Sequence, residues 1–395
     1  MTLPSSEHFP GTDFNALLNQ MARFDLIIVQ RVTSLPLIRM LKKATTILGK
    51  PLVYVVDDDY FHLEYHNPCY WGTALGGLPK VRRELLAQGK VKEARALEAQ
   101  MEQPRLQGLE ELKEAISYPD CIICTTAELR EVLLPYNKNI HVFSNQMEQV
   151  YWENDYCMEE MREDGTLPPA TNDFGLASIP AFWPKPVKQE DGSIIQKPTR
   201  LLRIGYSGTS SHKEDFKTIQ KGLNRLAKKY ANQMWFVWLG DSWFADQQVD
   251  GRSRRHFIRE TPYEIYRYNM RNLDIGIAPL EPTPFNMSKS DLKALEMASW
   301  GTCPVLPNYV TYNRSFTHGQ NCMMYNNEQE FFDCMEHLIN NPSLRKTLGN
   351  NARKYVYEQR LEKHHALRRY KLYDALIKGS VGLKQHKKIM VSHGN

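Results

Sequence analysis

The chain has 395 residues, of which 42% are hydrophobic and 24% charged, and its formal net charge is +5. This length and composition indicate a globular protein with room for two ordinary domains. We find no apolar run of about 18 residues and no basic-then-apolar amino terminus, so we expect neither a membrane span nor a cleaved secretion signal. The seven scattered cysteines are an odd number, which favours a reducing compartment such as the cytoplasm. The mildly positive charge permits a polyanionic partner without requiring one.

Strand-like and helix-like segments alternate in the first part of the chain. FDLIIVQRV (residues 24–32) is typical of a buried parallel strand, LPLIRMLKKATTILG of the helix after it, and PLVYVVDDDYF of a second strand. This alternation predicts a parallel sheet with crossover helices. Residues 80–117 are rich in Lys, Arg, Glu, Ala and Leu, which predicts a solvated helical insertion. Gly89 and Pro104 are expected to divide it into two or three helices.

Three consecutive aspartates, Asp57, Asp58 and Asp59, end the second strand. In α/β proteins this is where ligands bind, because loops at the carboxyl ends of strands line the site. The three carboxylates are suited to bind a divalent metal, or to orient or deprotonate a substrate hydroxyl. They are equally suited to cap the next helix. The residues alone leave these roles open.

The composition changes between residues 151 and 199, where proline, glycine and polar residues prevail. We interpret this stretch as a connection between two domains. The second domain then opens with LLRIGYSGTSSHKEDF, in which a strand, a tight turn at Gly208 and a helix follow one another. Backbone N–H groups at a helix start attract anions, and Thr209, His212 and Lys213 add donors there. The turn therefore predicts an anion site.

The stretch NMSKSDLKALEMASWG, residues 286–301, predicts a helix between two strand-like segments, IGIAPL and CPVLPN. Ser288 or Ser290 is suited to cap the start of this helix, and Gly301 to end it.

Charged side chains of this helix are expected to share one face. Lys289, Lys293 and Glu296 lie at positions i, i+4 and i+7. Ammonium groups suit a phosphate, and a carboxylate accepts hydrogen bonds from sugar hydroxyls. The pattern indicates a nucleotide-binding site, although a solvated helix face with charge pairing has the same spacing.

Three segments, NLDIGIAPL, FNMSKSDLKALEMASWG and CPVLPNYVTY, together resemble the carboxy-terminal half of the GT-B glycosyltransferases of the group 1, or family 4, type. Members of that family usually carry two glutamates in this region. Glu296 matches the second, and Ser288 stands in place of the first. The resemblance is clear over roughly residues 200–375 and loose before them.

The resemblance implies an α/β fold of the GT-B type, with two Rossmann-like domains facing across a cleft and a first domain trimmed at its N-terminus. The expected parts are an acceptor domain at 1–150, a linker at 151–199, a nucleotide-sugar-binding domain at 200–378 that ends in a helix crossing back to the first domain, and a basic tail at 379–395.

The family's activity implies that a hexosyl or pentosyl group is transferred, with retention, from a nucleotide-diphosphate sugar to a hydroxyl. Lys289, Lys293 and the turn at 208–213 would stabilise the leaving diphosphate, which itself takes the acceptor proton. Glu296 would hold the ribose. The fold requires neither a metal nor another cofactor.

Three more residues are donor-site candidates through the resemblance. Relatives place the segment around Arg259 against the nucleobase. Asn286 belongs to the loop that would face the donor sugar, and Ser288 occupies the position of the first family glutamate.

The acceptor is expected to be hydroxymethylated DNA, as modified by viral enzymes of this plan, or a nascent surface glycan. The viral case would place the protein in the host cytoplasm. Asp57 and Asp58 would contact the acceptor hydroxyl. Two alternatives stay open, a catalytically inactive GT-B-like binding protein and a metal-dependent GT-A-like transferase that uses residues 57–59 as its DxD motif.

Overall fold

The computed structural model describes residues 14–64, 78–148, 182–188, 194–209, 212–231, 233–240, 254–259, 261–271 and 273–392. The chain divides into two compact units. The first comprises Met1–Ser144, Met287–Ser290 and His365–Asn395, and the second comprises Asn145–Asn286 and Asp291–His364. None of the helices in the described part of the chain combines the length and apolarity that a membrane span requires.

The first unit contains a parallel sheet whose four described strands follow chain order, as the alternating pattern predicts. They are β1 (Ile27–Gln30), β2 (Leu52–Val56), β3 (Cys121–Cys124) and β4 (Ile140–Val142). The central strand β3 is buried at every position, as expected of a parallel sheet covered on both faces.

Helices cover both faces of this sheet. One face packs against α1 (Phe14–Met21), α2 (Leu35–Leu48), α4 (Val91–Ser117) and α5 (Ala127–Leu133). The other face packs against α16 (Ala366–Ser392), which contributes Leu372, Tyr373 and Leu376. Helix α16 follows the second unit in sequence but belongs to the first, and it contains most of the segment marked above as a basic tail.

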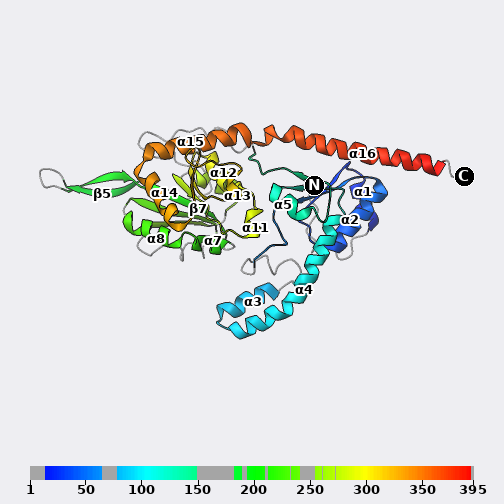
Figure 1. Cartoon of the computed structure of the whole chain (residues 1–395), viewed down its shortest axis with the longest axis horizontal. Helices are drawn as coiled ribbons and strands as arrows, with labels where there is room; N and C mark the ends of the chain where they lie inside the picture. The colour runs from blue at the N-terminus through cyan, green and yellow to red at the C-terminus, as the bar shows by residue number, and fades with distance from the viewer. Residues whose placement is uncertain are drawn as a thin grey trace. The chain divides into compact units, whose positions relative to one another are not determined.

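The predicted helical insertion is a pair of helices, α3 (Leu78–Ala87) and α4, drawn in cyan in Figure 1. Gly89 lies between them with a left-handed φ of 73°. Pro104 was expected to end a helix, but α4 continues through it. A proline weakens a helix because it lacks the N–H. Here Met101 and Leu112 on either side are buried, and their packing compensates for the lost hydrogen bond.

The second unit contains a parallel sheet of six described strands in the order β12-β11-β10-β7-β8-β9. In chain order these strands are β7 (Leu202–Gly208), β8 (Met234–Gly240), β9 (Arg254–Arg259), β10 (Ile275–Ile277), β11 (Cys303–Pro307) and β12 (Met323–Tyr325). The chain therefore builds outward from β7 in one direction and from β10 in the other. This order is that of a doubly wound nucleotide-binding sheet, in which direction reverses between the two central strands.

Two groups of helices enclose this second sheet (Figure 1). α7 (Lys213–Lys217), α8 (Gln220–Lys229) and α14 (Glu328–Asn340) pack on one face around Phe216, Trp238 and Phe331. α10 (Tyr263–Met270), α12 (Leu292–Ser299) and α15 (Pro342–Gln359) pack on the other. Shorter turns of helix are α11 (Pro284–Met287), α13 (Val310–Asn313) and η4 (Glu362–His364).

The predicted linker at 151–199 lies largely outside the described residues. Its described part is an antiparallel hairpin of β5 (Phe182–Lys188) and β6 (Ile194–Arg200), which belongs to the second unit. These residues therefore form a regular hairpin within the predicted connection. Backbone hydrogen bonding between the strands gives this proline-bearing segment regular structure.

A buried ion pair fixes the start of α12. The Arg360 guanidinium donates from Nη1 to Asp291 Oδ2 at 2.7 Å and from Nη2 to Asp291 Oδ1 at 2.9 Å. Arg360 is 6% exposed and Asp291 4%. Further hydrogen bonds join Nη1 to Ser315 Oγ at 2.6 Å and Nη2 to the carbonyl of Asn145 at 2.8 Å. The planar guanidinium therefore connects four chain segments of the second unit.

Replacing Arg360 with alanine should destabilise the protein by about 3–5 kcal/mol, because Asp291 would remain charged and buried without a partner. Urea unfolding checks this value. The matched control is Lys354→Ala on α15, whose partner Glu358 is 3.8 Å away and largely exposed, and this change should have almost no effect. Equal effects of the two variants would contradict the role assigned to Arg360.

Candidate functional site

The candidate site lies where strand order reverses in the second unit, between β7 and β10. At such a point the loops after the two strands diverge, and this leaves room for a ligand at their carboxyl ends. The loop after β7 begins at Gly208, and the chain after β10 leads through Asn286 to α12. Seven predicted site residues of this unit belong to these segments or to α12, namely Gly208, Thr209, His212, Lys213, Asn286, Lys293 and Glu296.

Tyr206 positions Lys293. The Lys293 ammonium donates to the Tyr206 hydroxyl at 3.0 Å and lies 4.5 Å from the centre of its ring. Tyr206 is 1% exposed, and burial raises its pKa far above the ordinary value, so the hydroxyl stays protonated. A Cβ on Gly208 would lie 2.4 Å from that hydroxyl. Gly208 is therefore needed for the tyrosine, and the tyrosine orients the lysine.

Glu296 lies one turn further along α12 and is 8% exposed. The Tyr266 hydroxyl donates a hydrogen bond to Glu296 Oε2 at 3.0 Å. Since Tyr266 has only one proton to donate, Ser207 donates to Tyr266 in the 2.6 Å contact between their hydroxyls. Burial raises the pKa of Glu296 to about 7, and the Tyr266 hydrogen bond and the Lys293 charge oppose this rise.

Asp215 connects the loops after β7 and β10. Its Oδ1 accepts from the backbone N–H of Glu281 at 2.7 Å and from Asn286 Nδ2 at 3.0 Å. Its Oδ2 contacts His212 Nδ1 at 2.7 Å. Asp215 is 4% exposed. The local sequence does not reveal this role, because an aspartate at the start of a charged helix has the same pattern whether it is buried or solvated.

The predicted anion site at the turn after Gly208 has a weak helix behind it. α7 has only five residues, and Glu214 and Asp215 lie in its first turn. The dipole of so short a helix is small, and the acidic side chains oppose an anion. Thr209 is exposed, and Lys213 is the first residue of α7. Their side chains stay candidates, but Lys293 is the better placed cation.

The prediction that Lys289 shares a helical face with Lys293 and Glu296 is wrong. α12 begins at Leu292 after Asp291, so neither Ser288 nor Ser290 caps it, and Lys289 precedes it. The residues Met287–Ser290 group with the first unit. There the carbonyl of Ser288 accepts from Thr126 Oγ1 at 2.8 Å, which holds the segment out of the helix. Gly301 follows the last turn with a left-handed φ of 77°, as expected of a helix end.

The three aspartates of the first unit have different surroundings. Asp57 accepts from Arg31 Nε at 2.7 Å and pairs with its Nη2. Asp59 is 1% exposed and accepts from the backbone N–H groups of Phe61 and His62 at 3.0 and 3.3 Å, as a turn-forming aspartate does. Among the described residues no three His, Cys, Asp or Glu side chains are grouped to hold a metal ion.

Asp58 has a raised pKa. Burial raises its pKa, and so does the neighbouring Asp57 charge, while Lys289 and Arg31 lower it. A carboxyl with a raised pKa is a candidate for handling a substrate proton. Arg31 has a left-handed φ of 53°, which is unusual for a side-chain-bearing residue and often marks a functional loop.

Arg259 is the residue predicted to lie near the nucleobase. The residue ends β9, at the carboxyl edge of the second sheet, opposite Gly240. Its side chain lies outside the described part of the structure.

Residues 220–372 match a family model described as glycosyl transferase-like. No curated protein matches the sequence significantly. Among solved structures, sucrose-phosphate synthase from Thermosynechococcus elongatus is 12% identical over 93% of this chain and 77% of that protein, with a TM-score of 0.56.

Two other solved structures show the same likeness. A UDP-forming α,α-trehalose-phosphate synthase from Burkholderia xenovorans is 10% identical over 96% of this chain and 81% of that protein, with a TM-score of 0.53. HepE from Anabaena, solved in complex with UDP, is 10% identical over 94% of this chain and 82% of that protein, with a TM-score of 0.51. The predicted GT-B fold is confirmed, and the GT-A-like alternative is wrong because two parallel sheets are present.

Because the pKa of Glu296 is raised to about 7, the folded chain binds a proton more tightly than the unfolded chain. Stability should therefore fall by about 3 kcal/mol as pH rises from about 4.5 to above 7. Glu296→Gln keeps an acceptor for Tyr266 and removes the titrating carboxyl. Urea unfolding should therefore show that the free energy of unfolding depends less on pH in this variant. Tyr266→Phe removes a hydrogen bond that lowers the pKa of Glu296, so this variant should lose stability at a higher pH than the wild type does. Equal slopes for wild type and Glu296→Gln would contradict the assignment.

Proposed function

We propose that this chain, a glycosyltransferase of the GT-B fold, transfers a sugar with retention from a nucleotide-diphosphate sugar to a hydroxyl acceptor. The observation that carries the proposal is the pairing of Lys293, oriented by Tyr206, with the buried carboxyl of Glu296 one turn along α12. This pair lies in the unit whose strand order reverses between β7 and β10. UDP is the first donor nucleotide to test, because two of the similar structures are named for it.

In this proposal Lys293 stabilises the charge that develops on the leaving diphosphate. A fixed cation at the position of developing charge is often the largest contribution to catalysis. Tyr206 holds the ammonium through a hydrogen bond and its ring face, so little reorientation is needed during the reaction. His212 and Lys213 would add donors from the loop after β7. A side-chain cation performs the task for which other transferases use a metal ion.

Glu296 would bind the ribose hydroxyls of the donor. A carboxylate accepts hydrogen bonds from both hydroxyls, and a protonated carboxyl accepts them less well. Since the pKa of Glu296 is about 7, donor affinity should rise as pH increases through neutrality. Asn286, which donates to Asp215, would present its backbone loop to the donor sugar.

The acceptor in this proposal is hydroxymethylated DNA or a nascent glycan. Asp57 and Asp58 would contact its reacting hydroxyl, and the leaving phosphate would take the proton. Asp58 supports this role because its pKa is raised beside Asp57.

The decisive experiment is a donor-hydrolysis screen. UDP-, GDP-, ADP- and CMP-sugars are incubated with the protein, with and without hydroxymethylcytosine DNA, while nucleotide release and DNA mass are followed. Release of UDP supports the proposed donor, and a hexose or pentose increment on DNA identifies that acceptor. If no donor binds or turns over, the chain is a GT-B-like binding protein and the proposal is wrong.

Lys293→Met should lower the turnover of the donor by about 10²-fold, because one group that stabilises transition-state charge is lost. Methionine keeps the apolar stem that packs on Tyr206, so the fold should be unaffected. Lys346→Ala, an exposed lysine on α15, serves as the control and should leave turnover unchanged. Full turnover by Lys293→Met would remove the lysine from the mechanism.

Asp57→Asn and Asp58→Asn should raise KM for the acceptor about tenfold while donor hydrolysis in water is maintained, because the two aspartates contact only the acceptor. Kinetics with varied acceptor and fixed donor separate the two effects. Asp120→Asn, which changes another carboxylate of the first unit, provides the comparison. If both variants transfer sugar normally, the aspartates have a structural role.

A further inference from the structure

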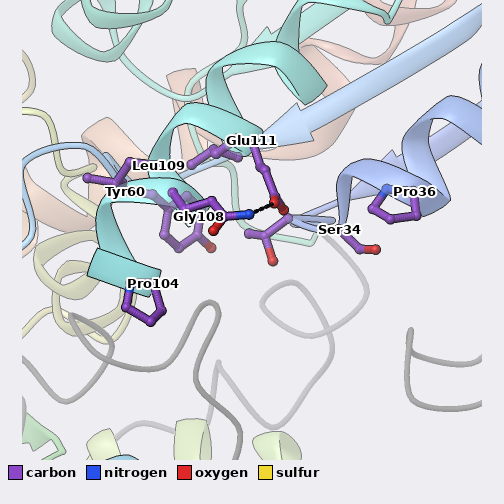
Figure 2. A pocket seen from close by; sticks show the side chains of 10 residues that line it. Ser34, Pro36, Tyr60, Pro104, Gly108, Leu109 and Glu111 are labelled. Carbon is purple, nitrogen blue, oxygen red and sulfur yellow. Dashed lines mark hydrogen bonds between the residues drawn. The ribbon is translucent and has the colours of Figure 1, made fainter. Parts of the chain in front are cut away.

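The first unit contains a cavity of about 350 Å³, and none of its described lining residues is one assigned to donor binding. Its walls come from the loop between β1 and α2, from Tyr60 after β2, and from α4 of the helical insertion (Figure 2). This volume is at the lower end of the range for small-molecule sites, roughly 300–1,000 Å³. A single small ring is a suitable occupant.

The lining is polar but almost uncharged. Among the described lining residues, Thr33, Ser34 and Tyr60 bear hydroxyls, Gln107 bears an amide, and Glu111 bears the one carboxylate. The described lining residues include no lysine, arginine or histidine. A phosphodiester needs cations to replace its counterions, so this cavity is unsuited to a DNA backbone.

The polar side chains of the cavity include both hydrogen-bond donors and acceptors. Gln107 Nε2 donates to Glu111 Oε1 at 3.1 Å, as drawn by the dashed line in Figure 2, so an amide and a carboxylate lie together in the cavity wall. Ser34 stands at the start of α2, yet its hydroxyl makes no capping hydrogen bond. Donors and acceptors that alternate in this way match a hydroxyl-rich ligand, because each sugar hydroxyl both donates and accepts.

An aromatic residue is part of the cavity wall. Tyr60 and Gly108 both line the cavity, and the glycine contributes no side chain that would fill it (Figure 2). An aromatic ring offers a flat apolar surface, and a few fixed polar groups around it set the orientation of a ligand. Gly108 is costly within α4, since glycine weakens a helix interior by about 1 kcal/mol relative to alanine. The open space that it leaves in the cavity gives the glycine a role.

We infer that this cavity binds an uncharged sugar ring, the end group of a glycan. That such a ring is the acceptor of the reaction rests on the proposed function, whereas sugar binding itself does not. The inference selects the glycan over hydroxymethylated DNA, and it gives the helical insertion a part in recognition.

The test is direct binding, measured by saturation-transfer NMR with the full chain and no donor present. The probes are the methyl glycosides of glucose, galactose and N-acetylglucosamine, and, separately, a hydroxymethylcytosine DNA duplex. Gly108→Leu fills the cavity and also favours the helix, so the variant should fold and should lose glycoside binding. Gln103→Leu places the same side chain at an exposed position of α4 outside the cavity and should keep binding.

A second pair of variants tests the ring. Tyr60→Leu should weaken glycoside binding about three- to tenfold through the loss of the aromatic face, and Tyr60→Phe should restore most of it. The inference is overturned if no neutral glycoside binds, if Gly108→Leu binds as well as wild type, or if this substitution abolishes DNA binding instead. If no donor reacts in the screen but glycosides still bind, the proposed transfer reaction is rejected and the sugar-binding site is retained.

Discussion

The bidentate pair between Arg360 and Asp291 is the interaction on which the second unit's site depends. Both groups are almost fully removed from water, so each is costly unless the other is present. Asp291 immediately precedes α12, and its fixed position sets the rotation of the helix that carries Lys293 and Glu296. The guanidinium also binds the carbonyl of Asn145, so the geometry of the helix is coupled to a segment far away in sequence.

The partly buried Lys293 and the buried Glu296 lie one turn apart on α12, and each is hydrogen-bonded to a tyrosine. Tyr206 accepts from the ammonium of Lys293, while Tyr266 donates to the carboxyl of Glu296. A protonated phenol serves both purposes without adding charge, and burial keeps both phenols protonated by raising their pKa values. The site thereby combines an ammonium group with a carboxyl whose pKa is raised to about 7.

Much of the fold follows from sequence patterns, because buried parallel strands are apolar runs and helices have periodic apolar faces. Phe216 on α7 and Leu223 and Leu226 on α8 are apolar residues of this kind, and all three are buried. The site was harder to predict, since its interactions depend on tertiary contacts. Lys289 matches the helical spacing but lies outside α12, where a hydrogen bond from Thr126 takes the chain away from the helix. Nothing in the local sequence of Arg360 indicates that it pairs with a residue 69 positions earlier.

The return of α16 to the first unit has a consequence for how the protein is made. Val53, Cys121, Ile123 and Phe143 are apolar residues of the first unit that pack against Leu372, Tyr373 and Leu376 of α16. A ribosome would synthesise the whole second unit before that helix emerges. During synthesis one apolar face of the first sheet therefore lacks α16, whereas all residues of the second unit are already present. Truncation before residue 365 should accordingly damage the opposite end of the sequence, where the missing helix would have packed.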